Sequence, residues 1–493
     1  MEALSLDLSK ASPEALAERS EELKAKANKL FVAGSWKEAE ELYTEAIDCN
    51  PSNHILYSNR SNCHLRLEQY GYAMEDAKKT IELCPSYAKG YYRRGCAHVS
   101  LGKYKEALKD FAIVCKLAPK DKGALARYMD CKKAVRREAF EAAIECEQNK
   151  KASETIILDE IQVPESYDGL RLQSTEAEHL NEAWIRELME YYREQKKLHI
   201  RFVYEILLKA LDLFKKQPTL VDVPVPENGT VMVYGDVHGQ YYDLLNALSL
   251  SGLPSATNVL VFNGDLVDRG SWSVEVIVLL LAIKVAFPEH MHIARGNHET
   301  RSMNKVYGFE GEVKHKYNEK CFELFLELFN TLPLAHLVQE KIFVCHGGLF
   351  SEDNVTLDDV RSINRFREPP DSGLMCELLW SDPQRGANST GRAPSPRGVG
   401  VAFGADVTKN FLETNKLSYV IRSHEVRANG YEVEHDGKLI TVFSAPNYCD
   451  QQGNMAAIIK IEADLKPQFI TFKHVEHPPM KPMAYSNMRG FGM

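Results

Sequence analysis

Two patterns of hydrophobic and polar residues divide this chain of 493 residues. In the first third, small and aromatic residues recur at a fixed interval within helix-forming sequence, which predicts stacked helical hairpins. From about residue 175 onward, short apolar runs rich in β-branched residues alternate with helical stretches, and six of the runs end in a polar cluster. This second pattern predicts a mixed domain of helices and strands with polar loops at its strand ends.

The interval in the first third is 34 residues, and it holds in several independent columns. The columns are alanine, proline, aromatic and mixed, at Ala39, Ala73 and Ala107; Pro51, Pro85 and Pro119; Trp36, Tyr70 and Tyr104; and Tyr43, Ala77 and Phe111. Alanine lets two helices cross closely, and proline ends each unit because it cannot continue a helix. This is the signature of the tetratricopeptide repeat (TPR). We therefore predict an all-α superhelix of three repeats over residues 18–121, followed by a capping helix and linker over 122–174.

Five polar side chains are predicted to line the concave groove of this superhelix, because they fall on the first helix of each repeat. They are Lys24, Asn28, Asn59, Lys89 and Arg93. The alternative is a solvated helical face, but donors that converge from three repeats favour an anion-binding groove. The five positions resemble the carboxylate clamp of TPR domains. The resemblance implies binding of the C-terminal Met-Glu-Glu-Val-Asp peptide of heat-shock protein 90.

Each of the six apolar runs in the second region leads into a short polar motif. The motifs are Gly235-Asp-Val-His-Gly239, Gly264-Asp-Leu-Val-Asp-Arg-Gly270, Gly296-Asn-His-Glu299, His346-Gly-Gly348, Arg422-Ser-His-Glu425 and Ser444-Ala-Pro-Asn-Tyr448. Loops at strand ends build active sites because the sheet fixes their geometry, and glycines permit the tight turns. One such Asp or His alone is most often structural. Together they predict a site for borderline divalent ions such as Mn²⁺, Fe²⁺ or Zn²⁺.

This constellation is similar to that of the binuclear metallophosphoesterases. Carried over residue by residue, the resemblance places one metal on Asp236, His238 and Asp265, and the other on Asp265, Asn297, His346 and His424. It implies two divalent metal ions per catalytic domain, with Mg²⁺ as a further candidate beside Mn²⁺, iron and Zn²⁺. A hydroxide that bridges the two ions is then the expected nucleophile on phosphorus.

Other motif residues match the acid and the phosphate ligands of the same family. His298 is the expected general acid for the seryl or threonyl oxygen that leaves, and Asp268 is expected to hydrogen-bond its imidazole. The expected phosphate ligands are Arg269, Asn297, His298, Arg397 and Tyr448. Core packing is the alternative role for Tyr448, and Arg392 is the alternative to Arg397.

The later motifs, with Trp380-Ser-Asp-Pro383 among them, make the resemblance more specific. Residues 175–480 resemble the phosphoprotein phosphatase family, whose α+β/α/β fold is a central β-sandwich flanked by helices. With the TPR array in front, the chain resembles the type-5 serine/threonine protein phosphatases. The segment 384–396 is longer and richer in Gly and Pro than the family's usual loop. Residues 481–493 form a C-terminal tail with weak helix-forming sequence.

The resemblance also implies how the enzyme is controlled. Type-5 phosphatases are autoinhibited by their own TPR domain, which also recruits them to heat-shock protein 90. Glu68, in the turn of the second repeat, is a candidate inhibitory contact, since a carboxylate can mimic phosphate and pair with Arg269. A solvated turn residue is the alternative interpretation of Glu68. Phosphoproteins are the expected substrates.

Composition narrows the partners and the compartment. The chain holds 60 Lys and Arg against 69 Asp and Glu, a net charge of −9, and it has no basic block, so nucleic-acid binding is not expected. The longest apolar run, residues 276–283, is too short to span a membrane. The 11 cysteines include no Cys-x-x-Cys pair and the N-terminus does not resemble a signal peptide, which favours a reducing compartment. We expect a monomeric protein of the cytoplasm and nucleus.

Two other functions stay open on the sequence. One is a different binuclear metallophosphoesterase, either a phosphodiesterase or a polyphosphatase, which would share the early motifs but not the Ser444-Ala-Pro-Asn-Tyr448 motif or the repeats. The other is a TPR chaperone scaffold with an inactive phosphatase fold. A protein of that kind would have lost a metal ligand or the acid, whereas every expected residue is present here.

Overall fold

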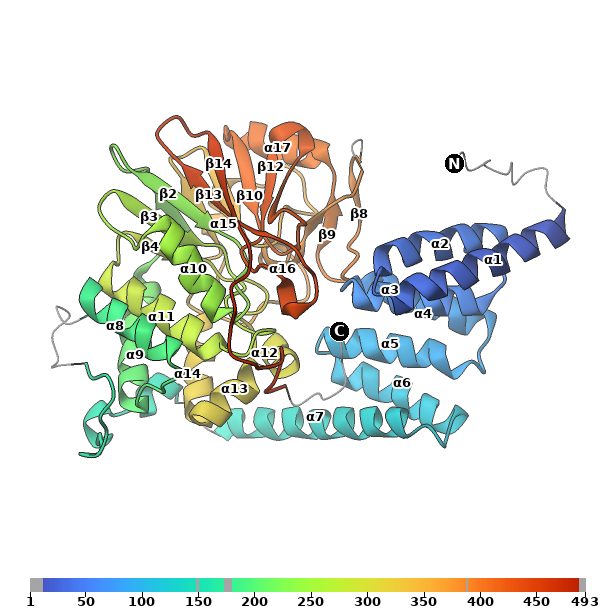
Figure 1. Ribbon diagram of the computed structural model, residues 1–493, viewed down its shortest axis with the longest axis horizontal. Helices are drawn as coiled ribbons and strands as arrows, with labels where there is room; N and C mark the ends of the chain where they lie inside the picture. The colour runs from blue at the N-terminus through green and yellow to red at the C-terminus, as the bar shows by residue number, and fades with distance from the viewer. Residues whose placement is uncertain (1–11, 148–149, 173–179, 387–388, 487–493) are drawn as a thin grey trace. The chain divides into compact units, whose positions relative to one another are not determined.

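The computed structural model describes residues 12–147, 150–172, 180–386 and 389–486, and it forms two compact units (Figure 1). The first unit contains the residues up to Asn149 together with the short segment Pro394–Gly398. The second contains Lys150–Ala393 and Val399–Asn487.

The first unit is a series of helices that pair along the chain. They are α1 (Pro13–Val32), α2 (Trp36–Cys49), α3 (His54–Arg66), α4 (Tyr70–Leu83), α5 (Ala88–Ser100), α6 (Tyr104–Leu117) and α7 (Lys122–Glu147). The aromatic column begins α2, α4 and α6, and the proline column lies two residues beyond the end of each of these helices. The first helix begins at Pro13, before the predicted start at residue 18, because Ser12 Oγ accepts a hydrogen bond from Ala15 N at 3.2 Å.

Small residues allow the helices of the first unit to pack closely. The alanine column is fully buried, since Ala39, Ala73 and Ala107 are all 0% exposed. A Cβ added to Gly95 of α5 would lie 3.0 Å from the ring of Phe111 on α6, so the aromatic side chain fills the space that the glycine leaves. These contacts confirm the predicted helical repeat fold.

An ion pair with a buried aspartate recurs in this unit at the same interval of the sequence. Arg60 of α3 donates to Asp76 of α4 with an Nη2–Oδ1 distance of 2.7 Å, and Arg94 of α5 donates to Asp110 of α6 at 2.7 Å. The two aspartates are 5% and 3% exposed. Each of these two hairpins therefore joins its own helices through a paired charge.

Two sheets form the centre of the second unit (Figure 1). The six-stranded sheet has the order β1 (Leu220–Val223), β5 (Ala335–Val338), β6 (Ile342–Cys345), β10 (Tyr419–Arg422), β12 (Leu439–Val442) and β11 (Tyr431–Glu434). The five-stranded sheet has the order β14 (Pro467–Phe472), β13 (Ala456–Ile461), β2 (Thr230–Tyr234), β3 (Asn258–Phe262) and β4 (Met291–Ile293). A third, small sheet has the order β7 (Asp382–Pro383), β9 (Val401–Phe403) and β8 (Arg392–Pro394).

The two large sheets share one apolar core. Val233 and Val261 of the five-stranded sheet are buried in the same cluster as Val344 and Ile421 of the six-stranded sheet. The next residue along each strand points to the opposite face, and there Tyr234 and Phe262 are buried in a cluster with helix residues. The expected sandwich flanked by helices is therefore confirmed.

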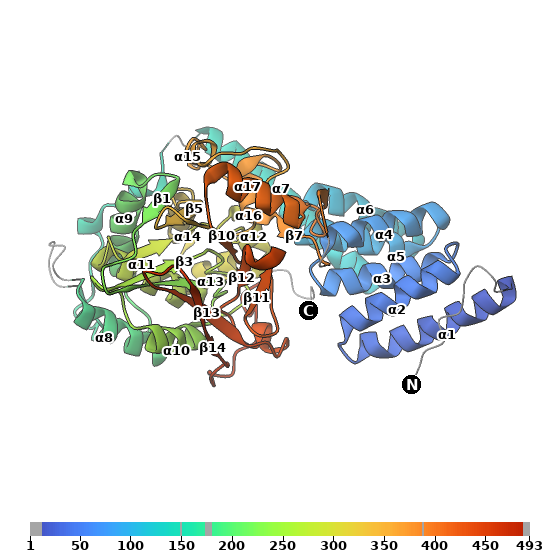
Figure 2. The same ribbon diagram turned by 90° about the horizontal axis from the view of Figure 1, so that it is seen from above.

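Helices cover the outer face of each sheet (Figure 2). One cluster of buried hydrophobic side chains joins the five-stranded sheet to six helices. They are α8 (Glu182–Arg193), α9 (Ile200–Lys216), α10 (Tyr241–Ser251), α11 (Ser273–Ala286), α13 (Phe309–Lys316) and α14 (Glu319–Phe329). A second cluster of buried hydrophobic side chains joins the six-stranded sheet to α15 (Leu357–Arg361), α16 (Leu374–Trp380) and α17 (Ala405–Asn415). The short helix α12 (Arg301–Tyr307) follows β4.

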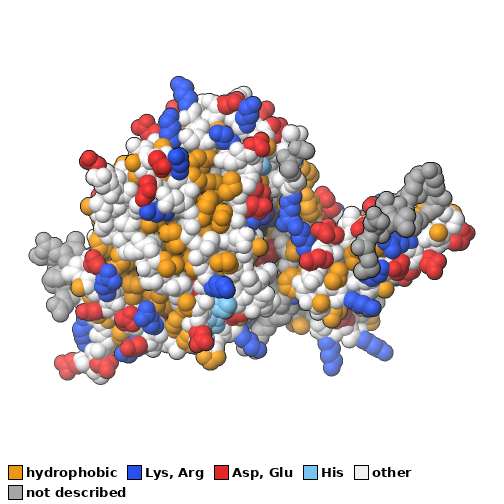
Figure 3. Space-filling view, turned by 45° about the horizontal axis from the view of Figure 1, so that its top comes forward, with side chains coloured by type: hydrophobic (Ala, Val, Ile, Leu, Met, Phe, Trp, Pro, Cys, Tyr) orange, Lys and Arg blue, Asp and Glu red, His pale blue; other side chains and the backbone are white. Residues whose placement is uncertain are grey.

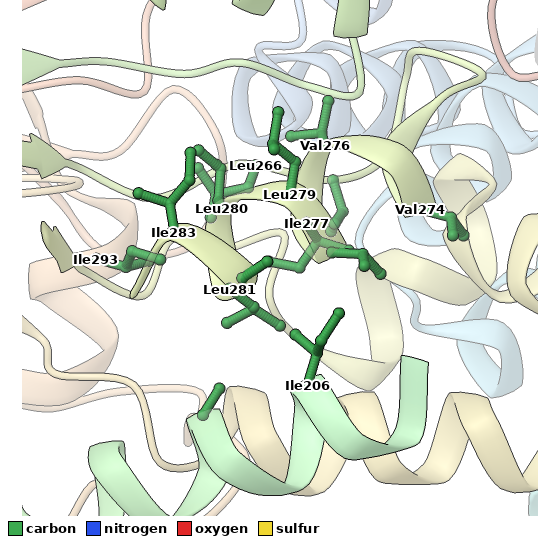
Figure 4. Close-up of a cluster of buried hydrophobic side chains, with 14 of the residues drawn as sticks. Ile206, Leu266, Val274, Val276, Ile277, Leu279, Leu280, Leu281, Ile283 and Ile293 are labelled. Carbon is green, nitrogen blue, oxygen red and sulfur yellow. The ribbon is translucent and has the colours of Figure 1, made fainter. Parts of the chain in front are cut away.

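The longest apolar run of the sequence lies in α11, which is buried on all sides (Figure 4). Its residues Ile277, Leu280 and Leu281 pack with Ile206 of α9 and with Ile293 of β4. A helix that is apolar all round fits the middle of a large core. None of the helices in the described part of the chain is long and apolar enough to cross a bilayer.

The second unit begins earlier than the boundary predicted at residue 175. Ile156 and Leu172 are buried in its largest core cluster, and Ser153 Oγ donates to Glu327 of α14 at 2.7 Å. The segment 150–172 looks like a polar linker in sequence, yet these few contacts attach it to the catalytic core.

On the face seen in Figure 3, acidic and basic side chains are interspersed.

Candidate metal centre and active site

The six predicted metal ligands all follow strand ends of the second unit. Asp236 and His238 follow β2, Asp265 follows β3, and Asn297 follows β4. In the other sheet, His346 follows β6 and His424 follows β10. Strands β2, β3 and β4 are parallel neighbours, as are β6 and β10, so within each sheet these loops leave the same edge. All six residues are buried.

The ligand atoms gather in two groups that share one carboxylate. In the part of the chain that the structure describes, His238, Asp265 and His298 place ligand atoms within 4.8 Å of one another. Asp265, His346 and His424 do the same. Asp265 belongs to both groups, as expected for a residue between two metals. His298, which the sequence suggested as an acid, lies in the first group.

His238 is the centre of the first group. Its Nε2 lies 3.5 Å from Asp265 Oδ2 and 3.6 Å from Asp236 Oδ2. Its Nδ1 lies 3.1 Å from the main-chain oxygen of Val267. A hydrogen bond from Nδ1–H to that carbonyl fixes the tautomer and directs the Nε2 lone pair at the carboxylates.

His346 is oriented in the same way in the second group. Its Nδ1 lies 2.8 Å from the main-chain oxygen of Asn263, and its Nε2 lies 3.3 Å from Asp265 Oδ2. The same Nε2 is 3.2 Å from His424 Nδ1. Both imidazoles therefore bind a main-chain carbonyl through Nδ1, as metal-bound histidines commonly do.

The side chain of Asn297 completes this group. Its amide oxygen lies 2.9 Å from His346 Nε2, 3.0 Å from His424 Nδ1 and 3.0 Å from Asp265 Oδ2. Lone pairs that face one another at these distances repel, and either a cation among them or an amide turned by 180° removes the repulsion. Oxygen and imidazole donors without thiolates are the set that borderline divalent ions prefer, so the residues fit such ions.

The pKa shifts in the site favour positive charge next to the carboxylates. Burial opposes a charge on His346, yet Asp265 raises the pKa of its imidazole to about 9. Burial likewise opposes a charge on His238, but Asp236 and Asp265 raise the pKa of His238 above its ordinary value. Burial disfavours the ionised form of Asp265 as well, but His346 and His298 hold the pKa of this carboxyl well below its usual range.

Strained backbone accompanies the ligands. The φ angles of His238, Asp265 and His424 are 48°, 51° and 70°, and those of Asp268 and Arg269 are 70° and 69°. Side chains other than glycine rarely adopt this left-handed region, and it persists where the surrounding structure enforces it.

Two glycines let the metal-binding loops approach each other. Gly264 has a φ of 87°, and a Cβ added there would lie 2.5 Å from Gly296 N. A larger residue at either position would separate the loop of Asp265 from the loop of Asn297.

His298 and Asp268 form a hydrogen-bonded pair beside the metal ligands. His298 Nδ1 lies 2.8 Å from Asp268 Oδ2. The same carboxylate accepts hydrogen bonds from Asn304 Nδ2 at 3.0 Å and from Phe309 N at 2.9 Å. Asp268 is thus held by three donors, and it leaves His298 Nε2 as the nitrogen that can face a substrate.

The predicted phosphate ligands differ in how closely the structure ties them to this centre. Arg269 is buried, and its guanidinium lies 3.8 Å from the centroid of the Tyr307 ring. Tyr448 is buried too, with its ring centroid 5.2 Å from that of His238, so it adjoins the first group.

The two candidate arginines, Arg392 inside the 384–396 segment and Arg397 directly after it, have different environments. Arg392 donates to Phe350 O at 2.7 Å and to Asp353 Oδ1 at 2.8 Å, so its guanidinium already binds that loop. Arg397 lies in the short segment that groups with the first unit, where its amide donates to Ser395 Oγ at 3.1 Å. Its phosphate role stays a prediction.

Sequence reasoning assigned no role to three buried polar residues that hold the loops together. Glu299 accepts hydrogen bonds from Asp265 N, Leu266 N and Gly296 N at 2.8–2.9 Å. Asn263 donates to Cys345 O at 2.7 Å and so links β3 to β6. Asn304 is the third, through its bond to Asp268. Of the three, only Glu299 lies inside one of the six polar motifs, Gly296-Asn-His-Glu299.

Burial and the nearby Asp265 raise the pKa of Glu299 to about 7, while the main-chain donors oppose that shift. The N–H groups of both metal-binding loops thus stabilise the carboxylate of Glu299 against the effect of burial.

The clamp residues of the first unit lie on its odd-numbered helices, as predicted. Lys24 and Asn28 are on α1, Asn59 is on α3, and Lys89 and Arg93 are on α5. Asn59 Nδ2 donates to Asn28 Oδ1 at 3.3 Å, which brings the first two repeats together at this point.

The basic side chains of the clamp differ in whether they are already paired with other groups of the protein. Lys24 pairs with Glu21, whereas Lys89 is exposed. Among the described residues, Arg93 Nε is buried without a hydrogen-bond partner. Tyr43 OH donates to Asn28 Oδ1 at 2.6 Å, so the amide nitrogen of Asn28 stays free of that contact.

The fold and the metal-binding loops define the class of protein. Residues 229–428 match the family model of the calcineurin-like phosphoesterases. Residues 88–121 match the tetratricopeptide repeat, and residues 128–222 match the model described as the PPP5 TPR repeat region.

Relatives that match nearly the full chain narrow the class to one family. The human serine/threonine-protein phosphatase 5 is 51% identical over 95% of this chain and 93% of its own length. Serine/threonine-protein phosphatase T of Aspergillus oryzae is 47% identical over 94% of this chain and 96% of its own. A solved Saccharomyces cerevisiae phosphatase, described as similar to human PP5, is 44% identical and covers 60% of this chain and 96% of its own, with a TM-score of 0.57. The chain belongs to the serine/threonine-protein phosphatase 5 family and is a protein phosphatase with TPR repeats, which confirms the resemblance seen in its sequence.

Proposed function

We propose that the second unit hydrolyses phosphoserine and phosphothreonine in proteins with the help of two divalent metal ions. The observation that carries this proposal is the position of Asp265, whose carboxylate belongs to both groups of buried ligand atoms. When bound, such a pair of ions supplies an activated water and offsets the charge of the phosphate. Asp236, His238 and Asp265 would hold one ion, and Asp265 with Asn297, His346 and His424 the other.

His298 supplies the proton for the leaving oxygen. Asp268 lies 2.8 Å from its Nδ1, so the ring is fixed with Nε2 directed away from that carboxylate. A seryl or threonyl alkoxide is a poor leaving group, and protonation by a positioned imidazole lowers the barrier to its departure. The pair resembles other His–Asp pairs in which the carboxylate orients the ring rather than taking up the proton.

Arginine side chains bind the phosphate oxygens. Arg269 is suited to this role because its guanidinium is planar, stays charged, and is held in one orientation against the Tyr307 ring. Arg397, Asn297, His298 and Tyr448 are the other phosphate ligands that we propose. Arg392 is not among them, because its donors bind Phe350 and Asp353.

Metal removal tests this function directly. We expect the purified full chain to release phosphate from a phosphoserine peptide, to lose this activity after dialysis against EDTA, and to regain it with Mn²⁺. Hydrolysis of a bis-aryl phosphate at a higher kcat/KM than the phosphopeptide would identify a phosphodiesterase instead. A full load of two metals with no turnover of either substrate would identify an inactive scaffold.

We also propose that the first unit binds the C-terminal peptide of heat-shock protein 90. The support comes from Lys89 and Arg93 on α5, which offer an exposed ammonium and a buried guanidinium Nε, and from the amides of Asn28 and Asn59 that meet at 3.3 Å. A terminal carboxylate next to an aspartate side chain presents two anions to such a set.

Calorimetry with the Met-Glu-Glu-Val-Asp peptide tests this partner. We expect Lys89→Glu to abolish binding, because it reverses a charge that faces the anions. Lys37→Glu makes the same charge change at an exposed position on α2, outside the clamp, and serves as the control. Equal affinities of the two variants would contradict the proposal.

Autoinhibition by the first unit is the remaining part of the proposal. Glu68 lies in the turn between α3 and α4 with a φ of 59°. If its carboxylate mimics phosphate, Glu68→Ala raises the basal turnover of a small aryl phosphate. An unchanged basal rate in the variant would reject Glu68 as the inhibitory contact.

A further inference from the structure

The chain returns to the active-site loops after its last strand. Residues 475–486, called the C-terminal strap here, run from α10 to α12 across the second unit (Figure 1). At one end Val475 N donates to Asp243 Oδ1 of α10 at 2.9 Å, and at the other Ser486 Oγ donates to Val306 O of α12 at 2.9 Å.

The middle of the strap is hydrogen-bonded to the loop that carries Arg269. Met483 N donates to Arg269 O at 2.8 Å. Ser271 Oγ donates to Lys481 O at 2.7 Å and accepts from Ala484 N at 3.2 Å. These three bonds tie the main chain on both sides of Gly270 to one short stretch of the strap.

Strained backbone marks both partners of the main contact. Met483 has a φ of 51°, next to Arg269 at 69° in the loop that it contacts. Non-glycine residues rarely adopt this region, so the conformation persists only where its surroundings impose it. The hydrogen bond between Met483 and Arg269 joins two such residues.

The strap also contacts the loop of Tyr448. His477 Nε2 lies 3.1 Å from Asp450 Oδ1, and the His477 ring packs on Trp272 with 5.2 Å between centroids. The strap therefore connects the loop after β3 with the loop after β12, both of which bear a proposed phosphate ligand.

Its last residues are fixed by close packing. A Cβ on Gly311 of α13 would meet the main-chain oxygen of Tyr485, so only glycine allows this approach. The Tyr485 ring lies 5.1 Å from that of His315 and 5.6 Å from Lys316 Nζ. Lys316 is in turn held by Glu275 and Glu312, at 2.6 and 2.8 Å.

We propose that the C-terminal strap positions Arg269 for phosphate, with Ser271 as the side chain that fastens the strap to the arginine loop. This inference rests on the proposed phosphate role of Arg269. The Tyr307 ring packs on the guanidinium, and Tyr307 O accepts a hydrogen bond from Arg269 N at 3.1 Å. The strap holds the main chain from the other side, through Arg269 O and Ser271. Arg269 can bind two phosphate oxygens only if the plane of its guanidinium and the position of its main chain are both correct. Catalytic groups tolerate displacements of only a fraction of an ångström.

The test is a double-mutant cycle in the full chain with Arg269→Ala and Ser271→Ala. The readouts are the inhibition constant of inorganic phosphate, kcat/KM for a phosphoserine peptide, the bound metal measured by mass spectrometry, and Tm. We expect Ser271→Ala to weaken phosphate binding roughly tenfold, with two metals still bound. The double variant should be no weaker than Arg269→Ala alone, because Ser271 acts through the arginine.

Matched variants keep the result interpretable. Ser362→Ala removes a hydroxyl that donates to Asp358 O at 2.8 Å on exposed α15, and it should leave all four readouts unchanged. Ser271→Thr keeps the hydroxyl and should restore phosphate binding. If Ser271→Ala lowers Tm so far that kinetics cannot be measured, His477→Ala, at a partly exposed contact of the strap, should still weaken phosphate binding about twofold.

Each outcome has a distinct meaning. Additive effects in the double variant, or unchanged phosphate inhibition in both Ser271→Ala and His477→Ala, would overturn the positioning role of the strap. An unchanged inhibition constant in Arg269→Ala would instead reject the proposed phosphate ligand, and the inference about the strap would fall with it.

Discussion

The two units use buried charge differently. In the repeat unit, Arg94 donates to Asp110 at 2.7 Å, so the two charges neutralise each other across one hairpin. In the phosphatase unit, the carboxylates of Asp236 and Asp265 both lie within 3.6 Å of His238 Nε2, so two groups of like charge converge on one imidazole. Paired charges serve the stability of a fold, whereas convergent groups of like polarity cost stability and are kept for what they bind.

The largest effect that would sharpen this contrast is catalytic. His298→Asn should lower kcat for a phosphoserine peptide by about 10²–10⁴-fold, because the leaving oxygen loses its acid. Affinity for the heat-shock protein 90 peptide should not change, since that site belongs to the other unit. His290→Asn, outside the site, is the control. Activity of His298→Asn within twofold of the parent would show that this pair is only structural.

The contrast predicts a loss of stability in the repeat unit when one partner is removed. Asp110→Ala removes the buried carboxylate to which Arg94 donates, and Arg94, whose side chain is 26% exposed, loses its partner. This should cost about 1–3 kcal/mol of unfolding free energy in urea. The matched variant in the other unit is Glu323→Ala, which breaks a pair with Arg301 whose side chains are 36% and 26% exposed. That loss should be about 0–1 kcal/mol. Equal losses would contradict the role of burial.

A third prediction concerns the carboxylate that holds the metal-binding loops. Glu299→Gln should lower metal affinity about 10–100-fold, because one oxygen and an NH₂ group cannot accept all three main-chain hydrogen bonds. The measurement is Mn²⁺ binding by calorimetry. Glu323→Gln, at the exposed pair, is the control, and the same affinity in both variants would exclude Glu299 from positioning the ligands.

The smallest effect is a pH dependence of the stability of the phosphatase unit. Burial lowers the pKa of His292 to about 3, and it holds the pKa of the neighbouring His336 well below its ordinary value. The unfolded imidazoles take up protons below about pH 6.5 while the folded ones do not. Protonation therefore favours unfolding as the pH falls from there towards 3.

Each histidine should cost up to about 1.4 kcal/mol of unfolding free energy per pH unit in this window. Urea unfolding of the phosphatase unit at pH 7.5 and 5.0, in the parent and in His292→Gln, measures the effect. The variant should lose less stability than the parent on acidification. Parallel losses would show that His292 does not contribute.

The repeat unit was predictable because its determinants are local and periodic. Columns such as Ala39, Ala73 and Ala107 recur at helix crossings, so helix order and packing follow from spacing alone. The gathering of the predicted metal ligands was foreseeable for another reason, since each of these residues sits in a motif that directly follows an apolar strand.

Contacts between distant parts of the chain were not predictable in the same way. Nothing near residue 153 indicates that Ser153 binds Glu327, and nothing near Ser271 indicates that Lys481 and Ala484 will reach it. The first contact moves the start of the catalytic unit into the expected linker. The second attaches part of the expected tail to the active site. Asn263 and Glu299 likewise act through main-chain groups that carry no sequence signature.

The Arg–Asp pairs of the repeats have a consequence for how such an array can change over evolution. Arg60 and Asp76 lie in one hairpin, and Arg94 and Asp110 lie in the next, so each hairpin contains both members of its pair. A duplication or deletion of a whole 34-residue module would carry both charges with it. The array can therefore lengthen or shorten by one module without stranding an ion in its interior.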